Sequence, residues 1–127
     1  MNFSSIRIIT ADIKRLIDFY QQITRQPLTQ YTADFAELRT DTATLAIGST
    51  NTLALFGGAK VTQSTQNQSV IIEFRVDDVD AEYNRLATFI GDSLVQPPTT
   101  MPWGNRSLLF RDPDGNLVNF FTPGVVI

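Results

Sequence analysis

Two stretches decide the fold: residues 68–91, QSVIIEFRVDDVDAEYNRLATFIG, and residues 4–20, SSIRIITADIKRLIDFY. Each begins with apolar residues that alternate with polar ones, which is the period-two pattern of a strand with one buried face. Each continues with apolar residues at helical spacing, after a residue that suits a helix N-cap, Thr10 or Asp12 in one stretch and Asp78 in the other. Both stretches therefore predict a strand that leads into an amphipathic helix.

A shift of 66 residues lays one stretch on the other, since Ile72 then falls on Ile6 and Asp78 on Asp12 (72 − 6 = 78 − 12 = 66). Short strands are predicted to follow in both halves, at 35–39, 43–48 and 52–56 and at 93–96, 106–111 and 116–121. The expected fold class is α+β, with two tandem β-α-β-β-β modules that share a core. A single α+β sandwich with coincidental internal similarity is the alternative.

The domain organisation follows from the repeat and from a polar stretch between its halves. We expect one domain over 1–127, with module 1 at about 1–57, a linker at about 58–68 and module 2 at about 69–127. Neither module is expected to be stable alone, because modules of this size bury too little surface.

Composition narrows the classes of function. The 127 residues carry 10 basic and 13 acidic side chains, a net charge of −3. No basic run is present, and nucleic acid is not an expected partner because phosphate binding needs a clustered positive surface. The chain has no histidine and no cysteine, which excludes His-based triads, thiol chemistry and thiolate metal sites. Without a signal-peptide pattern or a membrane-length apolar stretch, we expect a cytoplasmic protein with no membrane partner.

The tandem repeat, DIKRLIDFY at 12–20 and FRDPDGNLVNFF at 110–121 together resemble the vicinal oxygen chelate superfamily, which comprises glyoxalases, bleomycin resistance proteins and extradiol dioxygenases. The segment PWGNR at 102–106 is more similar to the bleomycin-resistance branch than to the glyoxalases. The resemblance covers essentially the whole chain and implies two modules whose sheets curl into a cup. It also implies a homodimer in which two chains share or exchange modules.

Metal enzymes of this superfamily hold a cation with side chains from the first and last strands of both modules. The resemblance places these four positions at Ser5, at Ala54 or Leu55, at Ile71 and at Asn119. The apolar side chains cannot coordinate a cation, and neutral serine and asparagine oxygens bind one weakly without carboxylate neighbours. We therefore expect no metal and no cofactor. The alternative is an improvised cation site that uses Glu37 or Glu73.

If these family positions point into the cup, as the resemblance implies, strand alternation brings polar and apolar side chains to the same enclosed face, as in a ligand pocket with a few polar anchors. The candidate ligand-binding residues are Arg7, Glu73, Arg75, Trp103, Asn119 and Phe121. Two alternatives remain open. Arg7 and Glu73, equivalent under the repeat, would instead form a structural ion pair, and Trp103 would be either a lid over the core or a stacking platform.

The leading hypothesis is a metal-free protein of the glyoxalase/bleomycin-resistance type that holds an aromatic or amphipathic small molecule in the cup as a homodimer. The alternative is a divergent lyase or isomerase, either metal-independent with Glu73 as general base or with an improvised cation site. A third possibility is a structural or regulatory partner whose cup is filled by its own side chains.

Overall fold

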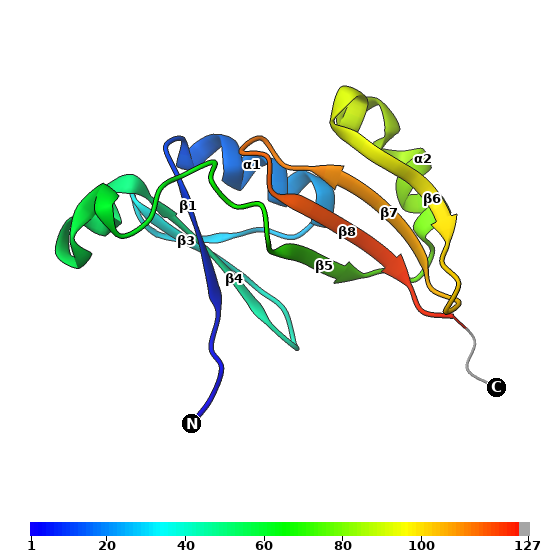
Figure 1. The fold of residues 1–127 in the computed structure, drawn as a ribbon, viewed down its shortest axis with the longest axis horizontal. Helices are drawn as coiled ribbons and strands as arrows, with labels where there is room; N and C mark the ends of the chain where they lie inside the picture. The colour runs from blue at the N-terminus through cyan, green and yellow to red at the C-terminus, as the bar shows by residue number, and fades with distance from the viewer. Residues whose placement is uncertain (125–127) are drawn as a thin grey trace. The chain divides into compact units, whose positions relative to one another are not determined.

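A computed structural model describes residues 1–124, which form two compact units that divide between Gln66 and Asn67 (Figure 1). In the first unit the elements are β1 (Ile6–Thr10), α1 (Ile13–Thr24), β2 (Thr29–Thr32), β3 (Phe35–Arg39), β4 (Thr44–Ser49) and the short 3₁₀ helices η1 (Thr50–Phe56) and η2 (Gly58–Lys60). Its sheet has the strand order β1-β4-β3-β2, with β1 parallel to β4 and the other neighbours antiparallel.

The second unit repeats this plan. Its elements are β5 (Ile71–Arg75), α2 (Val79–Ile90), a 3₁₀ turn η3 (Gly91–Ser93), β6 (Leu94–Thr100), β7 (Arg106–Arg111) and β8 (Leu117–Thr122). The strand order is β5-β8-β7-β6, again with one parallel pair, β5 and β8. The predicted α+β fold of two β-α-β-β-β modules is confirmed.

Both helices begin at the predicted aspartates. Asp12 accepts a hydrogen bond from the backbone N–H of Arg15 at 3.2 Å, and Asp78 accepts one from that of Ala81 at 3.1 Å. These caps satisfy donors that a helix N-terminus leaves free. Neither helix of the described residues is long and apolar enough to cross a bilayer.

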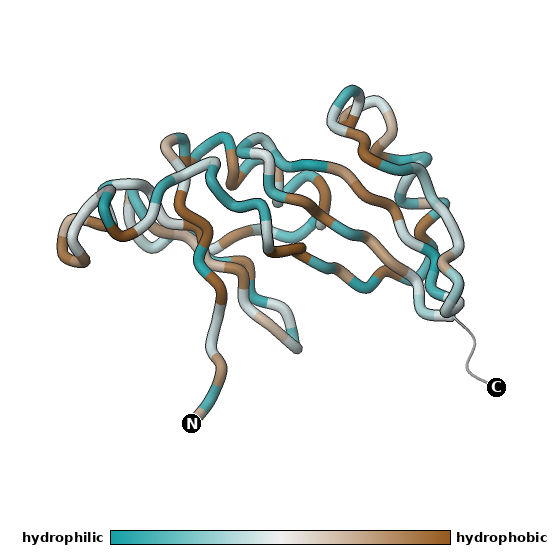
Figure 2. The backbone as a smooth tube through the Cα atoms, in the orientation of Figure 1, coloured by the Kyte–Doolittle hydropathy of each residue, from teal (hydrophilic) through white to brown (hydrophobic). Residues whose placement is uncertain are grey.

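Each sheet buries the face that its helix covers. In the first unit this core contains Leu16, Tyr20, Ile23, Leu38 and Ile47; in the second it contains Leu86, Leu108, Phe110, Val118 and Phe120. Along β8, Phe120 packs edge-on against Phe74 and Phe110, with ring centroids 5.6 and 5.3 Å away. Figure 2 shows the hydrophobic residues concentrated in the strands, whereas the segment that leads into β5 is largely polar. Ile6, although on the apolar face, is 46% exposed because it begins the edge strand β1.

The prediction of a strand at residues 52–56 is wrong. That segment lies in η1, where Ser49 accepts from the N–H of Asn51 at 3.2 Å and Thr52 donates to the carbonyl of Ser49 at 2.7 Å. These local bonds satisfy the backbone without a partner strand. Gly57, at φ 107°, then ends the turn. The strand that completes the sheet is β2, an exposed polar segment whose residues carry no alternation.

The Asp-Pro-Asp-Gly turn fixes the register of β7 and β8. One carboxylate oxygen of Asp112 accepts from the N–H groups of Asp114 and Asn116, both at 2.9 Å, and Gly115 adopts φ 86°. The other oxygen accepts from the Asn116 amide at 2.8 Å, and Asn67 donates to the Asn116 carbonyl oxygen at 3.1 Å. Every polar group of the Asn116 side chain thus has a structural partner.

Candidate functional site

The parallel pairing of β5 and β8 sets Glu73 opposite Asn119. The amide nitrogen of Asn119 donates to Oε2 of Glu73 at 2.9 Å. An ionised carboxylate can only accept hydrogen bonds, so the NH₂ group of the amide must be the part that faces Glu73. This orientation leaves the Asn119 carbonyl oxygen directed elsewhere.

That carbonyl oxygen, Oδ1, is buried without a hydrogen-bond partner among the described residues, and the Asn119 side chain as a whole is only 9% exposed. Leaving a buried acceptor unsatisfied costs about 1–3 kcal/mol. Folded proteins rarely keep such a group, and it is one of the observations that point to a site completed by another molecule.

The face around this pair is mixed in character. Leu109 on β7 lies opposite Asn119, Leu117 lies opposite Ile71, and Phe121 lies opposite Arg75. Strand alternation puts these side chains on the same face as Glu73 and Asn119, away from the apolar face that packs on α2. Ile71 is 50% exposed, and Phe121 is half-buried. The face thus combines polar acceptors with apolar neighbours.

Trp103 lies apart from this pair, in the turn between β6 and β7, and its side chain is 72% exposed. The turn closes with a hydrogen bond from the N–H of Gly104 to the carbonyl of Met101 at 2.9 Å. Gly104, at φ 101°, packs closely against Gly124. A Cβ on Gly124 would lie 2.7 Å from the carbonyl carbon of Gly104, so the contact leaves no room for a side chain there. The exposed indole does not cover the core of its own unit.

Arg7 lies in the first unit, where β1 pairs Arg7 with Ala46 of β4. Its guanidinium carbon lies 5.8 Å from the ring centroid of Phe35 and 5.3 Å from that of Phe56. This cluster was not predicted, because Phe56 was assigned to a strand at residues 52–56 and lies instead at the end of η1. The one signal in the sequence is the apolar run that ends at Phe56, which places an aromatic residue near the end of this module.

The two parallel strand pairs show which residues occupy equivalent positions. Glu73 is paired with Asn119 in one unit and Arg7 with Ala46 in the other, so the last-strand position of module 1 equivalent to Asn119 is Ala46. The earlier assignment to Ala54 or Leu55 is wrong, because both lie in η1.

The residues at the four family positions do not fit a metal ion. Ala46 and Ile71 offer no donor, Ser5 is an exposed hydroxyl, and Asn119 offers a single neutral oxygen beside one carboxylate, Glu73, which is too few charged ligands for a cation site. Nor does any group of three acidic side chains in residues 1–124 lie close enough together to hold a cation. Glu37 lies opposite Ala46, without a second carboxylate beside it in the sheet register.

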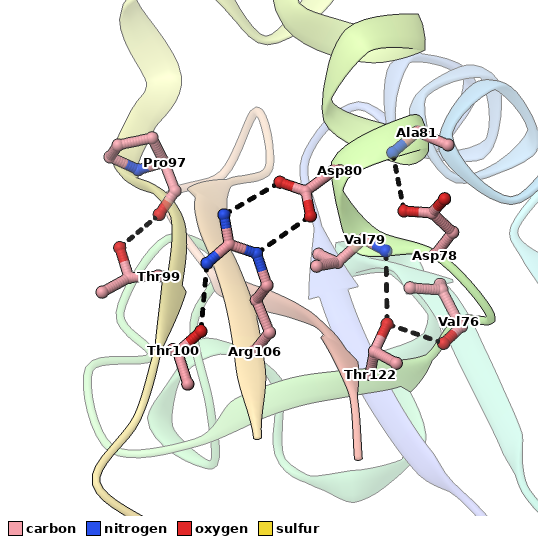
Figure 3. A network of polar contacts seen from close by, with 10 residues as sticks. All are labelled: Val76, Asp78, Val79, Asp80, Ala81, Pro97, Thr99, Thr100, Arg106 and Thr122. Atoms are coloured by element: carbon pink, nitrogen blue, oxygen red, sulfur yellow. Dashed lines mark hydrogen bonds and ion pairs between the residues drawn. The ribbon is translucent and has the colours of Figure 1, made fainter. Parts of the chain in front are cut away.

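A separate polar network ties the start of α2 to its own sheet (Figure 3). Arg106 on β7 makes two hydrogen bonds to the carboxylate of Asp80, at 2.9 and 3.0 Å, and a third to Thr100 at 3.1 Å. These hydrogen bonds hold the pKa of Asp80 below its ordinary value of 3.8 and raise the pKa of Arg106. Thr122 accepts from the N–H of Val79 at 3.2 Å and donates to the carbonyl of Val76 at 3.1 Å. All these groups serve the placement of α2.

The profile of the Glyoxalase/Bleomycin resistance protein/Dioxygenase superfamily matches residues 2–120. The uncharacterized protein YraH of Bacillus subtilis (strain 168) is 26% identical over 125 residues, which cover 95% of this chain and 98% of that protein.

Solved structures show the same fold. A glyoxalase/bleomycin resistance protein/dioxygenase family enzyme from Burkholderia phytofirmans PsJN superposes with a TM-score of 0.82 at 20% identity, covering 94% of this chain and 96% of its own. A glyoxalase/bleomycin resistance protein/dioxygenase from Nocardioides gives 0.77 at 20% identity, covering 100% and 90%.

Proposed function

This chain belongs to the glyoxalase/bleomycin resistance protein/dioxygenase superfamily, and we propose that it is a metal-free protein that binds a small aromatic or amphipathic organic molecule. The observation that carries the proposal is the buried, unpartnered carbonyl oxygen of Asn119 beside the Glu73 carboxylate. In the metal enzymes of the family this position holds a carboxylate, as the sequence resemblance implies. Asparagine keeps an oxygen there but removes the charge that a cation requires.

The chemistry of the pair indicates what the ligand must offer. Oδ1 of Asn119 is an acceptor, and Glu73 has a second oxygen besides the one that Asn119 engages. Two acceptors are complementary to a ligand that carries N–H or O–H donors. Leu109 and Phe121 share this face and suit an apolar body, while Arg75 is a second polar anchor. Pockets that join a few polar anchors to apolar walls are typical of small-molecule sites.

A melting-temperature screen against small amphipathic aromatic compounds, with amines and alcohols included, tests the proposal. A ligand that binds only the native protein must raise its melting temperature. We expect hits whose shift falls strongly in Glu73→Gln. The matched control is Asp92→Asn, which removes an exposed carboxylate from η3.

Two results would refute the proposal. One is the absence of any hit across a broad library, which would favour a face filled by its own side chains. The other is stoichiometric, tightly held manganese, iron, nickel or zinc in elemental analysis of the purified protein.

A homodimer is part of the proposal, and the sheet edges support it. Within its own sheet β5 pairs on one side only, and Val70 and Ile71 at its start are 42% and 50% exposed. The opposite edge strand, β6, contains Pro97 and Pro98 and two register shifts, which are features that blunt an edge against pairing. We therefore propose that a second copy docks on the β5 edge. A cytoplasmic location, expected from the sequence, completes the proposal.

A further inference from the structure

We infer that Arg7 is the centre of a second recognition site, in the first unit, which takes an aromatic carboxylate. The inference goes beyond the proposed function because it concerns the other unit and an anionic, hydrogen-bond-accepting ligand group instead of a hydrogen-bond donor. It rests on how the structure holds the Arg7 side chain.

The guanidinium group of Arg7 is held by two aromatic rings. Its carbon lies within 6 Å of the centroids of both Phe35 and Phe56, at 5.8 and 5.3 Å, a separation at which cation–π attraction operates. Within the first unit no carboxylate forms an ion pair with Arg7, although the side chain is exposed. A guanidinium group that is held in place while its N–H donors remain unpaired is preorganised to bind an anion.

The backbone next to Arg7 makes room for this arrangement. Gly48, in the buried central strand β4, lies opposite Ile9 of β1 and Phe35 of β3. A Cβ at Gly48 would come within 3.0 Å of Cδ of Arg7 and 2.9 Å of Oγ1 of Thr52. The stem of Arg7 therefore occupies the space that any larger residue at position 48 would fill.

The aromatic surroundings indicate an apolar body on the anion. Tyr31 and Phe56 are 51% and 55% exposed. The Tyr31 ring lies 6.1 Å from that of Phe35, so the rings extend from the guanidinium along the sheet. The planar fork of arginine matches a carboxylate through two parallel hydrogen bonds, and neighbouring rings stack on an aromatic body. Benzoate is the simplest molecule that carries both features.

The test is an NMR titration of the ¹⁵N-labelled protein with benzoate, followed at the Nε–Hε resonance of Arg7. Benzamide, which has the same ring without the negative charge, is the matched probe. We expect benzoate to shift the Arg7 resonance and to bind about ten-fold more tightly than benzamide, the usual effect of a charge-assisted pair. Inorganic phosphate should bind more weakly than benzoate, because it offers no ring for Phe35 and Phe56.

Variants distinguish binding at the Arg7 cluster from binding at other exposed arginines. Arg7→Gln should weaken benzoate about ten-fold or more, and Phe56→Leu should weaken it several-fold while it keeps the cation. Arg39→Gln is the matched control, since Arg39 is an exposed arginine at the far end of β3 from Phe35. Equal binding of benzoate and benzamide, no binding of benzoate, or an equal loss in Arg39→Gln would overturn the inference.

The outcome is distinct from that of the proposed function. Hits in the melting screen that depend on Glu73, together with no benzoate effect at Arg7, would refute the Arg7 site alone. Benzoate binding that depends on Arg7, without any Glu73-dependent hit, would leave the Arg7 site standing and refute the assignment of the ligand site to Glu73 and Asn119.

Discussion

At the scale of single residues, two asparagines three positions apart have opposite roles. Asn116 is 3% exposed and has structural partners for both ends of its amide, Asp112 and Asn67. Asn119 is 9% exposed, yet its carbonyl oxygen has no partner among the described residues. The first amide holds a turn together, whereas the second is left with an acceptor that an incoming donor could satisfy.

The contrast predicts opposite effects on stability for the same substitution. Asn119→Leu removes an unsatisfied acceptor together with the hydrogen bond to Glu73, whose exposed carboxylate water can solvate instead, and should leave the free energy of unfolding within about 1 kcal/mol of the wild type, or raise it. Asn116→Leu strands an oxygen of Asp112 and should lower it by about 1–3 kcal/mol. Urea denaturation of both variants measures the difference. A larger loss in Asn119→Leu than in Asn116→Leu would mean that Asn119 is structural.

Gly48 offers a second prediction at this scale. Gly48→Ala places a methyl group within 3.0 Å of the Arg7 stem and should displace it from the rings of Phe35 and Phe56. We expect weaker benzoate binding and a changed Nε–Hε chemical shift of Arg7 even without ligand. Gly58→Ala is the control, because a Cβ there meets nothing within 4 Å, although its φ of 69° adds some backbone strain. An unchanged Arg7 resonance in Gly48→Ala would contradict the assigned role of Gly48.

At the scale of elements, the pair Asp80–Arg106 fastens the first turn of α2 to β7 (Figure 3). The pKa of Asp80 is lowered, so the pair stabilises the fold above the unfolded-state value near 3.8. That contribution is lost as the pH falls through the lower folded value. Both groups are partly exposed, at 55% and 39%, which makes the effect modest and sensitive to salt.

The expected result is that Asp80→Asn is less stable than the wild type at pH 7, and that the difference disappears at a pH below 3.8. Chemical denaturation across pH measures it, with Asp92→Asn as the exposed control. A difference that persists unchanged in acid would show that the ion pair does not account for it.

Most elements could be predicted from the sequence because their apolar residues follow the periods of helices and strands. The residues of β2 are exposed and polar, so no alternation marks this strand. The segment Thr52–Phe56 contains enough apolar residues to resemble a strand, but only Leu53 of η1 is buried. Local hydrogen bonds from Ser49 and Thr52 decide its conformation, and periodicity does not detect such bonds.

The sequence could predict which face of the sheet carries the candidate site, but not the contacts within it. Alternation put Glu73 and Asn119 on the same side of their strands, and the structure joins them by a hydrogen bond. The unpartnered Oδ1 could not be foreseen, because it depends on which way the amide turns. The contact between Arg7 and Phe56 was not predicted, because Phe56 comes near Arg7 only when residues 50–56 form η1 instead of a strand.

At the scale of the whole molecule, the proposed homodimer places a second copy on the β5 edge. Ile71→Lys puts a charge on that edge and should raise the dimer dissociation constant about ten-fold or more, because lysine on an edge strand opposes strand pairing. Val95→Lys on β6 is the matched control, since the two side chains are 50% and 48% exposed. Sedimentation equilibrium measures both. A monomeric wild type, or equal dissociation of the two variants, would contradict docking on β5.

Asn119 is proposed to serve a ligand rather than the fold. The most direct measurement is the melting temperature of the wild type and Asn119→Leu, each with and without a donor-bearing hit from the aromatic screen. We predict that the variant melts close to or above the wild-type temperature without ligand and loses most of the ligand-induced increase. An equal increase in both proteins would contradict the account.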